Sequence, residues 1–206
     1  MKNFVINWLK NDTLLSIKNR RSVRTFIDKP VSDESLQTIL TAANQAPSAH
    51  NQQSWRFVVI RGEKKSELVN LICEKAADFP KPVSVLLRLA SRSIVSAPVV
   101  IAVANNGELI SRGTELFKVH KDTAYDFFRI MEIQSSAAAV QNLLLAATSL
   151  GLSTVWLGVL VLIKSDILRF LGEPEGEFMA VIPVGYSAIK NTGPQKQSLE
   201  MIVKYL

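Results

Sequence analysis

The spacing of apolar and polar residues predicts a mixture of helices and strands along the chain. Residues 63–79 and 83–95 carry apolar side chains at helical spacing, so both are expected to form amphipathic helices. Residues 55–60 and 98–104 are short runs rich in Val and Ile, which favours strands. Because the second run has no polar face, we expect it to be covered on both sides of a sheet.

Capping residues predict two further helices. Ser32 is a good N-cap, and Val31 and Leu36 stand at the positions of a hydrophobic staple. Pro47 ends this helix shortly after its apolar stripe. Asp12 is expected to cap a shorter helix that ends near a group of arginines.

The rest of the chain is less regular. Residues 134–150 are apolar almost all round, which predicts a helix buried at the centre of the molecule or at an interface. Residues 178–184 are expected to form a buried strand, and the weak alternation of residues 199–206 predicts a last strand. Residues 105–125 are mixed and contain glycine, so they receive no element and leave room for a lid or substrate loop.

This order contains too few βαβ units for a doubly wound sheet, and it predicts an α+β fold with helices packed on a small sheet. The length of 206 residues suits a single domain over residues 1–206. Mean hydropathy is high, at +0.17, although no apolar run approaches the roughly 20 residues of a membrane span. We therefore expect no membrane insertion, and the excess apolar surface points to a subunit interface.

Charge and cysteine content argue against several kinds of partner and site. The net charge of +6 is spread along the chain, whereas nucleic-acid binding usually requires clustered basic residues, so no nucleic-acid partner is expected. Residues 1–10 lack a secretory-signal pattern, which favours a cytoplasmic location. Cys73, the only cysteine, lies in an apolar helical pattern and is interpreted as an inert thiol. No metal-ligand spacing occurs, so no metal site is expected.

The first candidate site is the basic cluster of Arg20, Arg21, Ser22 and Arg24. Arg20 and Arg24 share one side whether the segment is helical or extended. Guanidinium groups suit a phosphate because they bind it bidentately. The alternative is a solvated basic helix end, where arginines favour the helix dipole.

The second candidate is the loop at residues 46–55, which contains Pro47, Ser48, Asn51 and Gln53. Its hydroxyl and amide groups could follow the hydroxyls of a ribityl or sugar chain. The alternative is a capping loop whose polar groups satisfy its own backbone. His50 is a candidate for proton transfer because it is a histidine, but no Asp or Glu is close to it in sequence, so the role stays open.

Five segments together resemble the FMN-dependent nitroreductase family. They are RRSVRTF (20–26), APSAHNQQSW (46–55), AAVQNLLLAA (138–147), GLSTVWLG (151–158) and IPVGY (182–186), and they occur in family order. The resemblance implies a nitroreductase-like α+β fold with a small, mostly antiparallel sheet. It also implies a homodimer that exchanges its C-terminal segments and holds two FMN molecules at the subunit interface.

The resemblance also implies roles for single residues. Arg20 and Ser22 would bind the FMN phosphate, with Arg21 adjacent, and Arg24 would lie near the N1/O2 edge of the ring. Pro47, Ser48, Asn51 and Gln53 would lie toward the ribityl or pyrimidine side, and the backbone of Leu157 and Gly158 would face N5. Lys196 fills one place of the family's C-terminal basic pair, whereas Pro194 and Gln195 leave the other empty. Ser54 stands where the family usually has proline.

The implied activity is an oxidoreductase that takes hydride from NAD(P)H at flavin N5 and reduces a small acceptor by a ping-pong mechanism. The acceptor would be a nitroaromatic, a quinone or an unsaturated carbonyl compound. No side-chain acid or base is certain to be catalytic, because the chemistry belongs to the cofactor. The alternatives are a relative that dehalogenates its substrate or fragments the flavin, and a non-catalytic FMN-binding protein.

Overall fold

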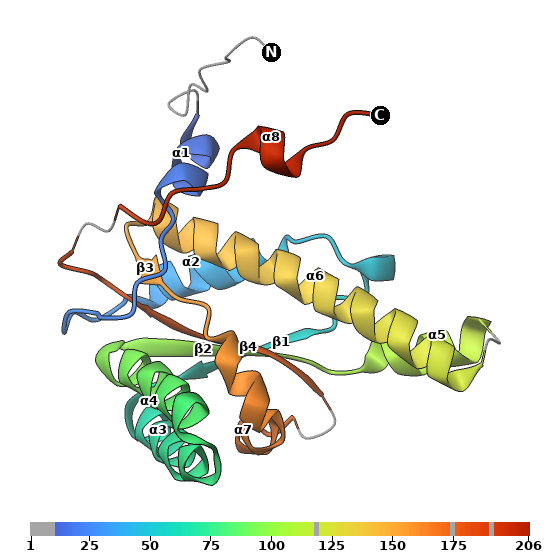
Figure 1. Cartoon of the computed structure of the whole chain (residues 1–206), viewed down its shortest axis with the longest axis horizontal. Coiled ribbons are helices and arrows are strands. Elements are labelled where there is room, and N and C mark those ends of the chain that lie inside the picture. The colour runs from blue at the N-terminus through green and yellow to red at the C-terminus, as the bar shows by residue number, and fades with distance from the viewer. Residues whose placement is uncertain (1–10, 118–119, 174–175, 190–191) are drawn as a thin grey trace.

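The structure is a computed structural model that describes residues 11–117, 120–173, 176–189 and 192–206. The expectation for residues 1–10 therefore lies outside the described part. Four strands form one antiparallel sheet in the order β1-β2-β4-β3 (Figure 1). They are β1 (Trp55–Ile60), β2 (Val99–Asn105), β3 (Ser153–Thr154) and β4 (Glu177–Gly185).

Helices cover both faces of this sheet (Figure 1). The helices are α1 (Asp12–Asn19), α2 (Asp33–Asn44), α3 (Gly62–Lys75), α4 (Lys81–Ser96), α5 (Glu108–Phe117), α6 (Lys121–Ser149), α7 (Lys164–Leu171) and α8 (Leu199–Ile202). Val100 and Ala102 of β2 face a core shared with α3, α4 and α7, whereas Val99 and Ile101 face a core shared with α2 and α6. The α+β fold and the doubly covered strand are thus confirmed.

The start of α2 matches its predicted cap. The Ser32 hydroxyl accepts the N–H of Ser35 at 3.1 Å, and both staple residues, Val31 and Leu36, are buried. The cap of α1 was predicted one residue too late. Asn11, not Asp12, accepts the N–H of Leu14 at 2.9 Å, because its side chain stands before the first helical residue.

Residues 105–125 receive no element from the sequence, and the structure places α5 and the first turns of α6 over most of this stretch. Gly113 belongs to α5, and a Cβ at this position would collide with the ring of Phe128 on α6. The glycine therefore permits close helix packing and does not interrupt the helix. The helix predicted over residues 134–150 correspondingly begins earlier, at Lys121.

The predicted last strand is also wrong. Residues 199–202 form α8, a single short helix, and the described tail pairs with no strand of the sheet. Six apolar side chains of the tail are at least 41% exposed: Leu199, Met201, Ile202, Val203, Tyr205 and Leu206. Among the helices of the described ranges, none is both long enough and apolar enough to cross a bilayer.

Candidate functional site

The basic cluster lies on an extended segment beside the sheet. Helix α1 ends at Asn19, and the next residue has extended dihedral angles. Ser22 forms a parallel bridge with Thr154 of β3, and the N–H of Val23 donates to the Thr154 carbonyl at 2.9 Å. Side chains alternate along extended backbone, so Arg20, Ser22 and Arg24 share one side of this segment.

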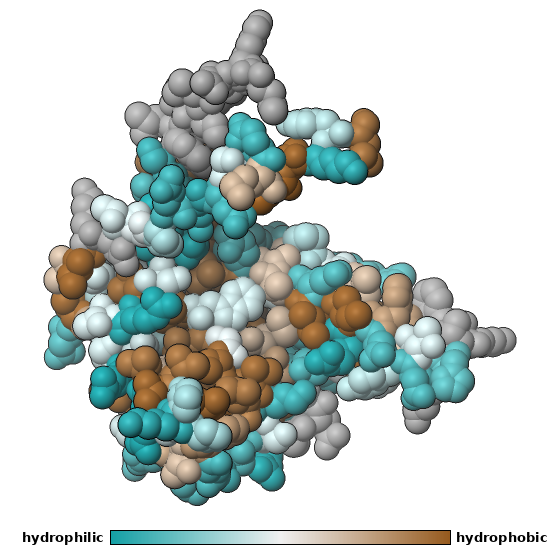
Figure 2. Space-filling model, in the orientation of Figure 1, coloured by the Kyte–Doolittle hydropathy of each residue, from teal (hydrophilic) through white to brown (hydrophobic). Residues whose placement is uncertain are grey.

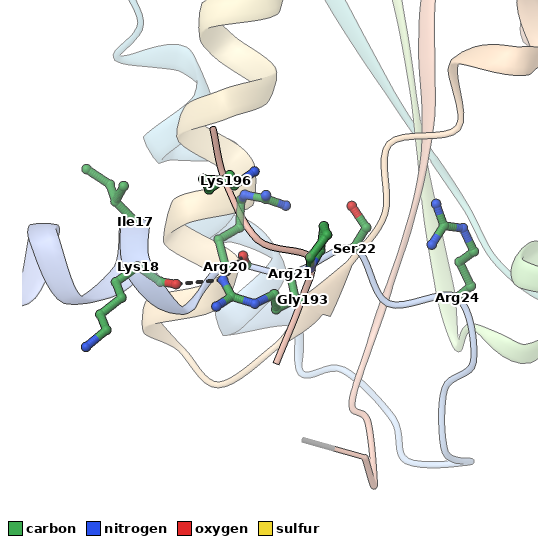
Figure 3. Close-up of a pocket in the computed structure, with 9 residues that line it drawn as sticks. Ile17, Lys18, Arg20, Arg21, Ser22, Arg24, Gly193 and Lys196 are labelled. Atoms are coloured by element: carbon green, nitrogen blue, oxygen red, sulfur yellow. Dashed lines mark hydrogen bonds between the residues drawn. The ribbon is translucent and has the colours of Figure 1, made fainter. Parts of the chain in front are cut away.

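These three residues, Arg20, Ser22 and Arg24, line a basic cavity of about 530 Å³. Figure 3 shows their side chains projecting from the same side of the segment. Lys18 and Lys196 line the same cavity, and none of the described residues that line it carries a carboxylate. A cavity with several cationic side chains, a hydroxyl and no acidic group has the chemistry of an anion site.

Arg21 also lines the cavity, but its guanidinium donates to backbone carbonyls of the chain itself. Its Nε donates to the Thr192 carbonyl at 3.0 Å, and its Nη1 donates to the carbonyls of Lys18 and Arg20 at 2.6 and 2.8 Å. Gly193 permits this approach, since a Cβ there would lie 2.5 Å from Arg21 Nε. Arg21 thereby fastens the C-terminal segment that carries Lys196 to the basic cluster.

A second, apolar cavity of about 480 Å³ adjoins the first. Its lining residues are Arg24, Thr25, Leu86, Leu89, Ala90, Arg92, Ser93, Trp156, Leu157, Gly158 and Val159. Arg24 lines both cavities, so the basic end and the apolar end meet at its side chain. The N–H of Leu157 donates to the Val181 carbonyl of β4 at 3.0 Å, which fixes the 156–159 wall against the sheet.

The loop that carries Ser48, Asn51 and Gln53 closes on itself. The Ser48 hydroxyl accepts the N–H of Gln53 at 3.1 Å, and Gln53 Nε2 donates to Asn51 Oδ1 at 3.0 Å. His50, Asn51 and Gln53 all have positive φ, of 51°, 52° and 50°. Such conformations cost energy outside glycine and are concentrated at functional sites.

The structure does not bring this loop to the basic cluster within one subunit. Neither Pro47, Ser48, His50, Asn51 nor Gln53 lines either cavity. The loop rests instead on α5 and α6, where the N–H of Ala49 donates to Ser135 Oγ at 3.1 Å and Gln52 pairs with Glu108. Helix α2 lies between the two candidate segments along the chain, and its 12 residues span about 18 Å. Figure 1 shows α2 beside α6.

A buried carboxylate next to this loop was missed by the sequence reasoning. Glu132 of α6 is 1% exposed, and its Oε1 accepts the N–H of Leu109 at the start of α5 at 2.9 Å. Ser54, which replaces the family's proline, lies beside this carboxylate and favours its charged form, whereas Glu132 Oε2 has no hydrogen-bond partner among the described residues. Burial raises the pKa of Glu132 above its usual value, against the hydrogen bonds that lower it.

We expect the contribution of Glu132 to the free energy of unfolding to fall as pH rises. Because its pKa is raised in the folded protein, the native state holds a proton that the unfolded chain releases, and the stabilisation is lost as pH rises through the folded pKa. In urea unfolding from about pH 5 to about pH 8, the stability of the wild type relative to Glu132→Gln should therefore decline. A constant difference would contradict the prediction.

Glu177 provides a control, because its pKa is shifted in the opposite direction. Burial alone would raise its pKa, but the hydrogen bond and charge of Arg129, at 2.7 Å, together with Lys164, lower it. Its stabilisation is therefore present above the usual glutamate pKa and is lost as pH falls through the lowered one. The stability of the wild type relative to Glu177→Gln should decline toward acid, and not toward neutral pH.

Comparisons with known proteins agree with this architecture. A candidate NADH dehydrogenase/NAD(P)H nitroreductase from Archaeoglobus fulgidus is 33% identical over 178 residues, which cover 85% of each chain. A similarly named protein from Methanothermobacter thermautotrophicus is 32% identical over 182 residues, covering 87% of this chain and 79% of that protein.

Among solved structures, a candidate nitroreductase from Desulfovibrio desulfuricans in complex with FMN superposes with a TM-score of 0.71. It is 29% identical, and the match covers 96% of this chain and 98% of that one. The model of the nitroreductase family matches residues 17–186, which include the basic segment, the 46–55 loop and the wall of the apolar cavity. On the extent of this match and on the shared fold, the chain belongs to the nitroreductase family.

Proposed function

We propose that this protein is an FMN-dependent oxidoreductase that takes reducing equivalents from NAD(P)H and passes them to a small acceptor. The acceptor would be a nitroaromatic, a quinone or an unsaturated carbonyl compound. One observation carries the proposal: a basic cavity and an apolar cavity meet at Arg24. Their volumes, about 530 and 480 Å³, are in the range of cofactor and small-molecule sites.

The residues present fit FMN. FMN is an elongated molecule with a phosphate at one end and an apolar, planar ring system at the other. The basic cavity offers arginine, lysine and hydroxyl groups to the phosphate, and the apolar cavity offers Trp156, Leu157 and Val159 to the ring system. When bound, FMN would supply hydride and electron chemistry at N5.

The chain's own residues bind and orient the cofactor in this proposal. Arg20, Ser22 and Lys196 would hold the phosphate, and Arg21 positions Lys196 through the C-terminal segment. Arg24 places a fixed positive charge between the two cavities, where it would stabilise negative charge on the bound ring. The backbone of Leu157 and Gly158 lines the apolar cavity and would face the ring. No side-chain acid or base is assigned to the reaction.

The proposal includes a homodimer with composite sites. The loop with Pro47, Ser48, Asn51 and Gln53 would complete the cavity of the partner subunit, because none of these residues lines the basic cavity of its own chain. The exposed apolar tail supports the proposed exchange of C-terminal segments, since isolated subunits rarely leave such a surface uncovered. Residues 134–150 support the dimer less than expected, because they pack mostly against α2 and the sheet of their own chain.

We expect the protein to purify yellow and to follow ping-pong kinetics. Heating should release FMN and not FAD, because the matching nitroreductase structure from Desulfovibrio desulfuricans is a complex with FMN. NAD(P)H and the acceptor should use the same exposed face of the ring in turn, so double-reciprocal plots at several acceptor concentrations should give parallel lines. Stoichiometric FAD, or a colourless protein that does not bind added FMN, would contradict the cofactor assignment.

Two further outcomes would change the proposed kinetic mechanism or the proposed catalytic function. Intersecting lines in the same plots would require a ternary complex and would contradict the shared face. A yellow protein that oxidises neither NADH nor NADPH under anaerobic titration would instead be a non-catalytic FMN-binding protein.

A further inference from the structure

The FMN ring proposed for the apolar cavity would contact residues 156–159, which leaves a second wall of the cavity without a role. It is formed by α4, which is apolar on two sides. Leu87 and Ile94 are fully buried in the core, whereas Leu86 and Leu89 line the cavity and remain 51% and 47% exposed. Figure 2 shows this hydrophobic surface over α4. Contiguous exposed apolar surface beside a cavity is typical of a ligand-binding wall.

The same wall carries a positive charge. Arg92, one helical turn after Leu89, lines the cavity, and Arg24 lines it from the opposite segment. No carboxylate is among the lining residues, and among the described residues none forms an ion pair with Arg92. The wall therefore combines leucine surface with a guanidinium group that has no acidic partner.

We infer that the apolar cavity selects flat aromatic acceptors that carry an anionic group. Leu86 and Leu89 would contact the ring of the acceptor, and Arg92 would pair with its carboxylate. The inference rests on the proposed function, since it names the acceptor class of that site. The phosphate of NADPH is the other source of such an anion, and the experiment distinguishes the two.

The test compares two isosteric probes, para-nitrobenzoate and para-nitrobenzamide, which differ in one negative charge. Isothermal titration calorimetry is performed on the oxidised, FMN-loaded protein without any nicotinamide nucleotide, so the readout is binding and not turnover. The benzoate should bind roughly tenfold more tightly, because a hydrogen bond to a charged group outweighs a neutral one, even when exposure weakens it. Higher ionic strength should reduce this preference.

Two variants of α4 assign the preference to Arg92. Arg92→Gln should bring the ratio of the two dissociation constants close to one. Arg88→Gln, which removes an exposed arginine that does not line the cavity, should keep the wild-type ratio. The FMN content of both variants is measured by absorbance, so that a lost cofactor is not mistaken for a lost acceptor.

Three outcomes would overturn the inference. The first is equal binding of both probes by the wild type, and the second is an unchanged ratio in Arg92→Gln. The third is a variant that binds NADP⁺ more weakly but para-nitrobenzoate normally, which would assign Arg92 to the electron donor. Each differs from failure of the proposed function, in which the FMN-loaded wild type would not oxidise NAD(P)H at all.

Discussion

Replacing Arg20 by alanine is expected to weaken FMN binding by about tenfold to a hundredfold, the equivalent of a lost charged hydrogen bond of about 1.5–3 kcal/mol. Arg20 lies at the end of α1, is only partly exposed and lines the basic cavity. Its guanidinium can bind a phosphate through two parallel hydrogen bonds. Partial burial limits the solvent screening that weakens fully exposed charge pairs.

Lys196→Ala should have a smaller effect than Arg20→Ala. Lys196 is exposed, and its ammonium is a single point charge on a flexible stem. Titration of the apoproteins with FMN, followed by quenching of flavin fluorescence, gives both dissociation constants. Arg20→Lys should lie between the wild type and Arg20→Ala, because it keeps the charge and loses the bidentate geometry.

The backbone N–H of Arg20 closes the last turn of α1 by donating to the Ser16 carbonyl at 2.9 Å, and the alanine variant keeps that bond. The apoprotein should therefore melt near the wild-type temperature, which separates a binding defect from a folding defect. Equal losses in Arg20→Ala and Lys196→Ala, or a larger loss in Lys196→Ala, would show that the phosphate lies elsewhere.

The core elements could be predicted because local pattern and tertiary environment agree there. Ser32 caps α2 as expected, and β2 is covered on both faces as its uninterrupted Val and Ile run predicts. α5 was not predicted, because residues 105–125 are mixed in polarity and contain glycine. Only the contact between Gly113 and Phe128, a tertiary feature, explains why glycine stands within the helix.

The candidate site was predictable in residue type but not in placement. The even spacing of Arg20, Ser22 and Arg24 predicts a shared side, and the structure places them in one cavity with Lys196. No local pattern could reveal that the 46–55 loop lies at the opposite end of α2. The α4 wall was missed because Leu86 and Leu89 fit an amphipathic helix as well as Leu87 does.

Glu132 illustrates a second limit. Its charge suggests an exposed helix position, and its burial depends on partners from other elements. The N–H of Leu109, which donates to Glu132, and Ser54, which lies beside the carboxylate, come from segments that are distant in sequence. The departure from the family at Ser54 was visible in the sequence, but its position beside Glu132 was not.

Mixing two defective variants is expected to restore FMN binding if the sites are composite. Arg20→Ala damages the basic cavity of its own subunit, and Asn51→Ala damages the loop that would reach the partner's cavity. In a mixed dimer, one site then combines the intact arginine segment with the intact loop, and the other site carries both defects. Random reassociation should leave about a quarter of all sites intact, because half of the dimers are mixed and each has one good site.

The measurement is FMN bound per subunit, at a cofactor concentration where each variant alone binds little, after unfolding and refolding the two together. A chain with both substitutions, refolded with wild type, is the matched control. Its mixed dimers contain no intact site, so this mixture should bind less FMN than the same two proteins refolded separately. The two mixtures differ only in whether the two substitutions lie on the same chain or on different chains. If each site were built within one subunit, refolding the proteins together would change FMN binding in neither mixture.

The tail provides the remaining control for the dimer. Burying even three of its exposed apolar side chains at an interface would contribute about 5 kcal/mol, or more than about a thousandfold in the dimer dissociation constant. A chain that ends before Leu199 should therefore sediment as a monomer, bind FMN poorly and fail to complement Arg20→Ala. A wild-type protein that sediments as a monomer with FMN fully bound, or variants that gain nothing on mixing, would contradict the composite site.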